Sequence, residues 1–266
     1  MEPRTFDTPD GLHLELRIPS GSINVETADI SSTTVEIRGE KDANEFRIEL
    51  TPLADGGHRL RIHQERRAFQ FGWTREVSVH VRAPGGVTVD AESGSADLEV
   101  DGDAGSIAFR SGSGDLRFSS VRGDVTAKCA SGDINGGSVA GGLVAHTASG
   151  DVEVGSAVGR IVARSASGDV RVGHAPGPVQ ATTASGDLSF GGLAHGEATL
   201  RSVSGDIDVG IATGTRVWLD LSSVSGDTRS DLDPSDAPEE GRDLVELRAQ
   251  SVSGDIRVRS DARGAS

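Results

Sequence analysis

Cysteine is nearly absent from this sequence: Cys129 is the only one, so no intrachain disulfide can form. Tyrosine is absent altogether, and aromatic residues make up 3% of the chain, which excludes a large aromatic core. No apolar run reaches the roughly 18 residues that a membrane-spanning helix requires. These shortages exclude a disulfide scaffold and a helical membrane protein, and we expect no direct insertion into a membrane.

Positive charge is also in short supply. The chain has 41 acidic and 26 basic residues and a net charge of −15, which makes nucleic acids and anionic lipid surfaces poor partners, and we expect no binding to nucleic acid. The N-terminal residues MEPRTFDTPDGLHLEL contain no apolar segment of the kind that a secretory signal needs. We therefore expect a cytoplasmic protein. The alternative location is the cell envelope, reached by a non-classical route.

Glycine, in contrast, is abundant, with 36 residues, and eight of them belong to a repeated Ser-Gly-Asp. The Asp residues of the complete copies are Asp115, Asp133, Asp151, Asp169, Asp187, Asp206, Asp227 and Asp255. Successive copies are 18 residues apart as far as Asp187, and the later spacings are 19, 21 and 28 residues. A degenerate first copy ends at Asp97. A fixed period near 20 residues is typical of a solenoid.

Apolar and polar residues alternate on both sides of each Ser-Gly-Asp. In one copy Leu188 and Phe190 follow the Asp, at one and three residues, while Val179 and Ala181 precede it. Such alternation predicts two β-strands, each with one buried face. A single rung cannot bury that face, so we expect rungs stacked into parallel sheets. Because parallel crossovers are right-handed, the sequence predicts an all-β, right-handed single-stranded β-solenoid with rungs of about 18 residues.

The organisation of the chain follows from where this period holds. Residues 1–85 alternate, as in LHLELRIPSGSINV, but lack the period. We expect them to form an N-terminal β-sheet cap, because an open solenoid end is an exposed sheet edge. Residues 86–260 are the predicted β-solenoid of Ser-Gly-Asp repeats, and residues 261–266 are expected to be a disordered tail.

The Ser-Gly-Asp repeat has two interpretations. In the first it is a corner, where Gly takes positive φ at no steric cost and the Ser and Asp side chains bond to backbone N–H groups. In the second the carboxylates form a calcium ladder, since hard cations seek carboxylate ligands. Regular calcium-binding repeats have an Asp about every nine residues, and this chain has one per 18, so the corner is favoured. The alternative ladder consists of Asp115, Asp133, Asp151, Asp169, Asp187 and Asp206.

Catalysis finds little support in the sequence. The seven His residues occupy different positions of the repeat, and a Ser and an Asp in one turn cannot place a His between them. Ser or Thr occupies the position of Cys129 in most other copies, which indicates a small buried side chain and not a reactive thiol. We expect no enzymatic activity, no catalytic residues and no cofactor.

The segment RRAFQFGWTRE, residues 66–76, gathers aromatic and basic side chains in an otherwise acidic protein. One interpretation is a hairpin that packs its aromatic side chains onto the end of the solenoid. The other is a tip that binds a partner protein or a second copy, since Trp, Phe and Arg are enriched at interface hot spots. The candidate contact residues are Arg66, Arg67, Phe69, Phe71 and Trp73.

The rungs SASGDVRV and SVSGDIDV, with LHLELRIPSGSINVETAD and VSVHVRAPGGVTVDAESGSADLEV near the N-terminus, resemble the bacterial "putative adhesin" β-strand-repeat proteins of unknown function. The resemblance covers nearly the whole chain. It implies a right-handed β-solenoid and no established catalytic residues. We therefore expect a non-enzymatic scaffold that binds unknown partner proteins and that can self-associate end to end or through the tip. The alternatives are a cell-surface adhesin or envelope-stress protein, and a calcium-binding repeat module.

Overall fold

The computed structural model describes residues 2–9, 11–39, 46–54, 56–64, 77–232 and 244–261. Within these ranges the chain forms β-strands and no helix, so no described helix could span a membrane. The chain divides into two compact units, residues 1–136 and 137–266, and the boundary falls within one strand. Each unit contains strands of two sheets, and the units are described in turn.

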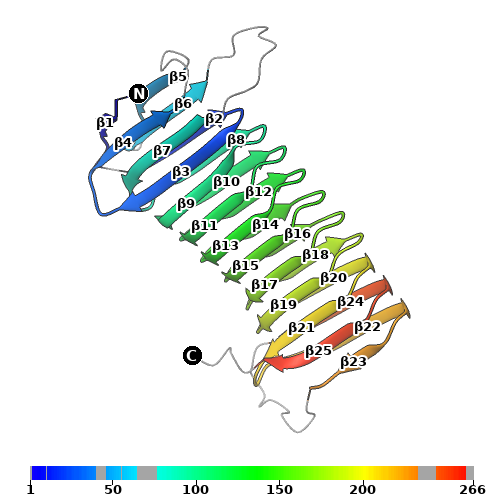
Figure 1. The fold of residues 1–266 in the computed structure, drawn as a ribbon. Coiled ribbons are helices and arrows are strands. Elements are labelled where there is room, and N and C mark those ends of the chain that lie inside the picture. Colours follow the sequence, from blue (N-terminus) through cyan, green and yellow to red (C-terminus); the bar gives the residue numbers. More distant parts are fainter. Residues whose placement is uncertain are drawn as a thin grey trace, which may run out of the picture. The chain divides into compact units, whose positions relative to one another are not determined.

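The strands of the N-terminal unit are labelled in Figure 1. In spatial order the first sheet contains β1 (Arg4–Asp7), β4 (Ser32–Arg38), β7 (Val77–Pro84), β3 (Gly21–Ala28), β9 (Asp97–Ala104), β11 (Leu116–Val121) and β13 (Ile134–Val139). The second contains β12 (Val125–Cys129), β10 (Ser106–Ser111), β8 (Thr88–Ser93), β2 (Leu12–Ile18), β6 (His58–Gln64) and β5 (Phe46–Pro52). Strands β1, β4 and β5 pair antiparallel with their neighbours. The N-terminal cap of residues 1–85 stays a prediction.

The C-terminal unit is built from two-strand rungs (Figure 1). Its first sheet contains β15 (Val152–Ala157), β17 (Val170–His174), β19 (Leu188–Leu193), β21 (Ile207–Ala212), β25 (Ile256–Asp261) and β23 (Thr228–Ser230). Its second contains β14 (Leu143–His146), β16 (Ile161–Arg164), β18 (Val179–Thr183), β20 (Gly196–Ser204), β24 (Leu244–Ser253) and β22 (Arg216–Ser225). These strands pair in parallel. The predicted all-β β-solenoid is confirmed.

The strand register matches the columns of the repeat. Strands β17 and β19 pair Val170 with Leu188 and Val172 with Phe190, as the spacing from each Asp predicts. All four side chains are buried, and the polar residues between them face outward. Each rung therefore contributes a few apolar side chains to a core that only stacking completes, because one strand shields just one face of its neighbour.

Two rungs lie out of sequence order. In the N-terminal unit, β2 and β3 pair on one side with β6 and β7 and on the other with β8 and β9. In the C-terminal unit, β24 and β25 lie between the rung of β20 and β21 and the rung of β22 and β23. The last repeat in the sequence is therefore an inner rung in space, which accounts for the 28-residue spacing before Asp255.

The rung of β22 and β23 ends both sheets of the C-terminal unit. Thr228 and Ser230 stand in its two inward columns, where the inner rungs carry aliphatic or aromatic residues, and both are exposed. On β22 the inward Val217, Leu219 and Leu221 are only half-buried. Polar residues are suited to these columns because a terminal repeat has no further rung to cover it.

Candidate functional site

The Ser-Gly-Asp corners are joined from rung to rung by hydrogen bonds. The carboxylate Oδ1 accepts a hydrogen bond from the backbone N–H of the Asp in the next rung in space at Asp97, Asp115, Asp151, Asp169, Asp187, Asp206 and Asp255. In the N-terminal unit Asp97 accepts from Asp115 at 2.9 Å. In the C-terminal unit Asp169 accepts from Asp187 at 2.8 Å, and Asp206 accepts from Asp255 at 2.8 Å. Charge-assisted bonds of this kind are among the stronger hydrogen bonds in proteins, and they favour the corner interpretation.

The second carboxylate oxygen of two of these Asp residues is also occupied. Asp115 Oδ2 lies 3.0 Å from Arg117, and Asp169 Oδ2 lies 2.6 Å from Arg171. In the part of the chain that the structure describes, no group of three or more His, Cys, Asp and Glu side chains is arranged to hold a metal ion. The calcium ladder of the sequence analysis stays a prediction.

Glycine occurs at these corners for a different reason from the one that the sequence suggests. None of the described Ser-Gly-Asp glycines has a positive φ. A Cβ added at Gly132 would lie 2.0 Å from the carbonyl oxygen of Gly114, and one at Gly186 would lie 2.2 Å from that of Gly168. The expectation of positive φ was therefore wrong. At Gly132 and Gly186 glycine is needed because the adjacent rung approaches too closely for a Cβ.

Asp169→Ala is expected to lower the free energy of unfolding by about 1 kcal/mol, since the N–H of Asp187 loses its acceptor. Asp169→Asn keeps an acceptor oxygen and is expected to lose less. Chemical denaturation of the purified variants measures both effects. Glu153→Ala, which removes an exposed carboxylate from the neighbouring strand β15, is the matched control. Equal losses in Asp169→Ala and Glu153→Ala would contradict a structural role for the carboxylate.

Cys129 occupies the inward position next to a corner, as the sequence indicates. Its side chain is buried, and in other rungs the equivalent Ser111 and Ser165 accept hydrogen bonds from the corner N–H groups of Gly114 and Gly168. Burial, together with the nearby carboxylates of Asp115 and Asp133, raises the pKa of the Cys129 thiol to about 11. The thiol therefore stays protonated near neutral pH, which suits a packing role.

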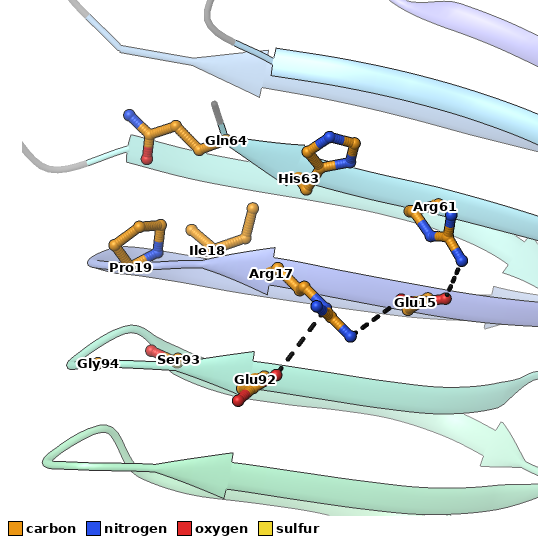
Figure 2. Close-up of a pocket in the computed structure, with 10 residues that line it drawn as sticks. All are labelled: Glu15, Arg17, Ile18, Pro19, Arg61, His63, Gln64, Glu92, Ser93 and Gly94. Carbon is orange, nitrogen blue, oxygen red and sulfur yellow. Dashed lines mark hydrogen bonds and ion pairs between the residues drawn. The ribbon is translucent and has the colours of Figure 1, made fainter. Parts of the chain in front are cut away.

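A groove with a volume of about 730 Å³ lies on the outward face of the N-terminal unit (Figure 2). Its lining comes from three adjacent strands, β6, β2 and β8, and from the turns that follow β2 and β8. Along β2 the apolar Leu14 and Leu16 face the core, so the alternating Glu15 and Arg17 face outward. The lining residues are Glu15, Arg17, Ile18, Pro19, Arg61, His63, Gln64, Glu92, Ser93 and Gly94.

A chain of ion pairs crosses the groove floor (Figure 2). Glu15 accepts a hydrogen bond from Arg61 at 3.0 Å and lies 3.4 Å from Arg17, which in turn lies 3.8 Å from Glu92. The hydrogen bond from Arg61 holds the pKa of Glu15 below its usual value, against the opposing effect of burial. Glu15 therefore stays ionised through the neutral range, and the paired charges leave this face close to neutral.

Two polar atoms in the groove lack hydrogen-bond partners among the described residues. They are Arg61 Nε and His63 Nδ1, and both are shielded from solvent. Buried polar groups are normally paired, so these atoms are the groove's available sites for a polar ligand group. Arg61 Nε can only donate a hydrogen bond, whereas His63 Nδ1 donates or accepts according to its tautomer.

This groove could not be found from the sequence, because its residues come from three separate segments. The available signal was the stretch HRLRIHQ of β6, whose alternate Arg59, Arg61 and His63 put basic groups on one strand face. The predicted contact residues Arg66, Arg67, Phe69, Phe71 and Trp73 lie outside the described residues, and their role stays a prediction. In the sequence this segment begins shortly after Gln64 on the groove rim.

Comparison with protein families gives a match over most of the chain. A family model described as Toastrack DUF4097 matches residues 13–262. No curated protein matches the chain.

The solved structures that match the chain share little sequence with it. A putative cell adhesion protein from Clostridium sporogenes ATCC 15579 is 10% identical, with a TM-score of 0.29 over 98% of this chain and 99% of that one. A putative lipid binding protein from Parabacteroides distasonis ATCC 8503 is 15% identical, with a TM-score of 0.44 over 98% and 96%. A putative adhesin from Bacteroides fragilis NCTC 9343 is 11% identical, with a TM-score of 0.41 over 98% and 97%.

Proposed function

Because the chain belongs to the Toastrack DUF4097 family, we propose that it is a non-enzymatic β-solenoid scaffold that binds partner proteins through its outward strand faces. The resemblance to the "putative adhesin" family of unknown function is confirmed by this match. One observation carries the proposal. The Asp carboxylates of the repeat accept hydrogen bonds from N–H groups of the neighbouring rung, so the repeated motif has a structural role in the solenoid.

The outward residues between the corners differ from rung to rung, so they can determine which partner proteins bind. Among them the groove on β2, β6 and β8 is the candidate contact surface of the N-terminal unit. Arg61 Nε and His63 Nδ1 are desolvated but unpaired, so a partner's polar group that reaches either atom after a shift of its side chain forms a hydrogen bond without displacing an existing one. Arg17, with a side chain 61% exposed and two long ion pairs, can exchange Glu15 or Glu92 for a partner carboxylate.

Affinity capture from the source cells tests the proposal. Arg17→Glu is expected to reduce recovery of the specific partner, because reversing a charge at a contact surface disfavours the complex. Arg82→Glu is the matched control, since Arg82 is 58% exposed, forms a 3.8 Å ion pair with Glu26, and lies on the other sheet of the same unit. If the native chain, Arg17→Glu and Arg82→Glu all recover the same partners, the groove is not the contact surface. If crosslinking in cells yields no specific partner, the scaffold proposal is wrong.

The cytoplasmic location stays a prediction from the sequence. Fractionation of the source cells, with immunodetection of the chain, measures it directly. Recovery mainly in the cytoplasmic fraction is the expected result. Recovery mainly with the envelope would favour the adhesin or envelope-stress alternative and would place the partner-binding face at that surface.

A further inference from the structure

The outer edge of β22 is long and unprotected. Strand β22 spans ten residues and ends its sheet, and none of the described strands pairs with its outer side. Protein sheet edges are commonly protected by proline, by charged residues or by short length. Strand β5, at an edge of the N-terminal unit, carries Pro52 and an Arg47–Glu49 ion pair. Strand β22 contains no proline, its only charged residues are Arg216 and Asp220, and its inward Val217, Leu219 and Leu221 are aliphatic.

Exposed apolar side chains gather at this edge. Val203, Val252 and Val224 lie in register on β20, β24 and β22, as the pairing of the serines on either side of each valine shows. They are 55%, 50% and 80% exposed, so exposure is greatest on the edge strand. Earlier rungs of this unit carry alanine at the same position, as at Ala166 and Ala184. A row of exposed valines confined to the last rungs indicates a surface that is covered in an assembly.

Trp218 supplies the complementary group at the other end of β22. Its ring is 49% exposed on the same outward face as Val224, and the guanidinium of Arg248 lies 5.7 Å from the ring centre. Trp218 and Val224 each lie three residues from Leu221. A twofold axis through Leu221 would therefore bring each Trp218 opposite the Val224 of another copy.

We propose that a second copy of this chain pairs antiparallel with β22 about a twofold axis at Leu221. The inference rests on the scaffold proposal and identifies one partner as the chain itself. The pairing extends the sheet across the dimer, and the Trp218 of each copy continues the other copy's row of valines. The outward charges of β22 are Arg216 and Asp220, so this edge is neutral although each chain carries a net charge of −15.

Other registers are less complementary. Centring the pair on Asp220 places two carboxylates opposite each other, which is unfavourable for a cross-strand pair. Centring the pair on Leu219 places the apolar Trp218 opposite the charged Asp220. Centring the pair on Trp218 shortens the overlap to five residues of each strand. The Leu221 register instead uses almost the whole strand and places Asp220 opposite Ser222.

Sedimentation or light scattering of the full chain tests the dimer. The native chain is expected to dimerise in a concentration-dependent manner. Val224→Lys is expected to raise the dimer dissociation constant about tenfold or more, because it removes two Trp–Val contacts. Val158→Lys is the matched control, since Val158 is 53% exposed in the same unit but lies outside β22, and it is expected to dimerise normally. Thermal melting checks that both variants fold.

Cysteine crosslinking tests the register. Opposite residues of an antiparallel pair have Cα atoms about 4.5–5.5 Å apart, within disulfide reach. A mixture of Asp220→Cys and Ser222→Cys chains is therefore expected to form disulfide dimers, whereas neither variant alone does. The native thiol contributes little background, since Cys129 is buried.

Three outcomes would overturn the inference. They are a native chain that stays monomeric at its highest soluble concentration, crosslinking of Asp220→Cys alone, and a ladder of larger oligomers from head-to-tail association. A monomer that still captures other partners through the groove would leave the scaffold proposal intact. A dimer without any other partner would support this inference and would contradict the proposal that the groove binds partner proteins.

Discussion

Gly132→Ala is expected to lower the free energy of unfolding by about 3 kcal/mol, the upper end of the usual cost of overpacking. The added Cβ would lie 2.0 Å from the carbonyl oxygen of Gly114 and 2.6 Å from its carbonyl carbon. These are backbone atoms of the adjacent rung, so only a separation of the rungs relieves the clash. That separation would lengthen the hydrogen bond between Asp133 N and Asp115 Oδ1, which is 3.0 Å long.

Urea denaturation followed by circular dichroism measures this loss. Gly85→Ala is the control, because a Cβ there has its nearest contact at 3.8 Å, with the Arg122 side chain, and the φ of Gly85 is not positive. The control is expected to change the free energy of unfolding by less than about 0.5 kcal/mol. Similar losses in the two variants would show that rung spacing does not select glycine at the corner.

Gly136→Val is expected to lower the free energy of unfolding by about 2 kcal/mol, also through overpacking. Gly136 occupies an inward column that carries valine in several other rungs, and the ring of Phe118 fills the space of its missing side chain. A Cβ at Gly136 would lie 2.1 Å from Phe118 Cζ. Phe118 is buried, so its ring cannot move aside into solvent without losing its apolar contacts.

A double-mutant cycle checks this complementarity. Phe118→Val alone is expected to destabilise the protein by leaving a cavity. Phe118→Val combined with Gly136→Val restores a valine pair like that of Val154 and Val172 in β15 and β17. The double variant is therefore expected to be more stable than either single variant, a strongly non-additive result. Additive losses would show that the two residues do not share one space.

The regular part of the fold could be predicted from the sequence because two short-range rules determine it. Alternation places Leu188 and Phe190 on the same face of a strand, and the constant spacing from Asp169 to Asp187 aligns equivalent residues of adjacent rungs. The corner could be predicted as a turn, but the reason for its glycine could not. The glycine is required by the short distance between adjacent rungs, which only the tertiary structure shows. The sequence had suggested a positive backbone φ as the reason.

The candidate site was beyond sequence reasoning for a related reason. Glu15, Arg61 and Glu92 meet because β2 pairs with both β6 and β8, and no local pattern specifies which outward faces become neighbours. Single residues gave only partial signals. Thr228 and Ser230 interrupt the apolar columns and mark a rung with an uncovered side, but they do not show that a later segment occupies the position before it.

By itself, the sequence determined the strands, their buried faces, the rung length and the register of the repeats, since each follows from side-chain alternation and a constant period. Tertiary structure alone decided the spatial order of the rungs, the groove and the open edge of β22. The physical reason is that a rung can pair in parallel with any other rung whose inward-facing residues align with its own. Rungs of equivalent sequence can exchange places, and only the complete set of contacts selects the order in which they stack.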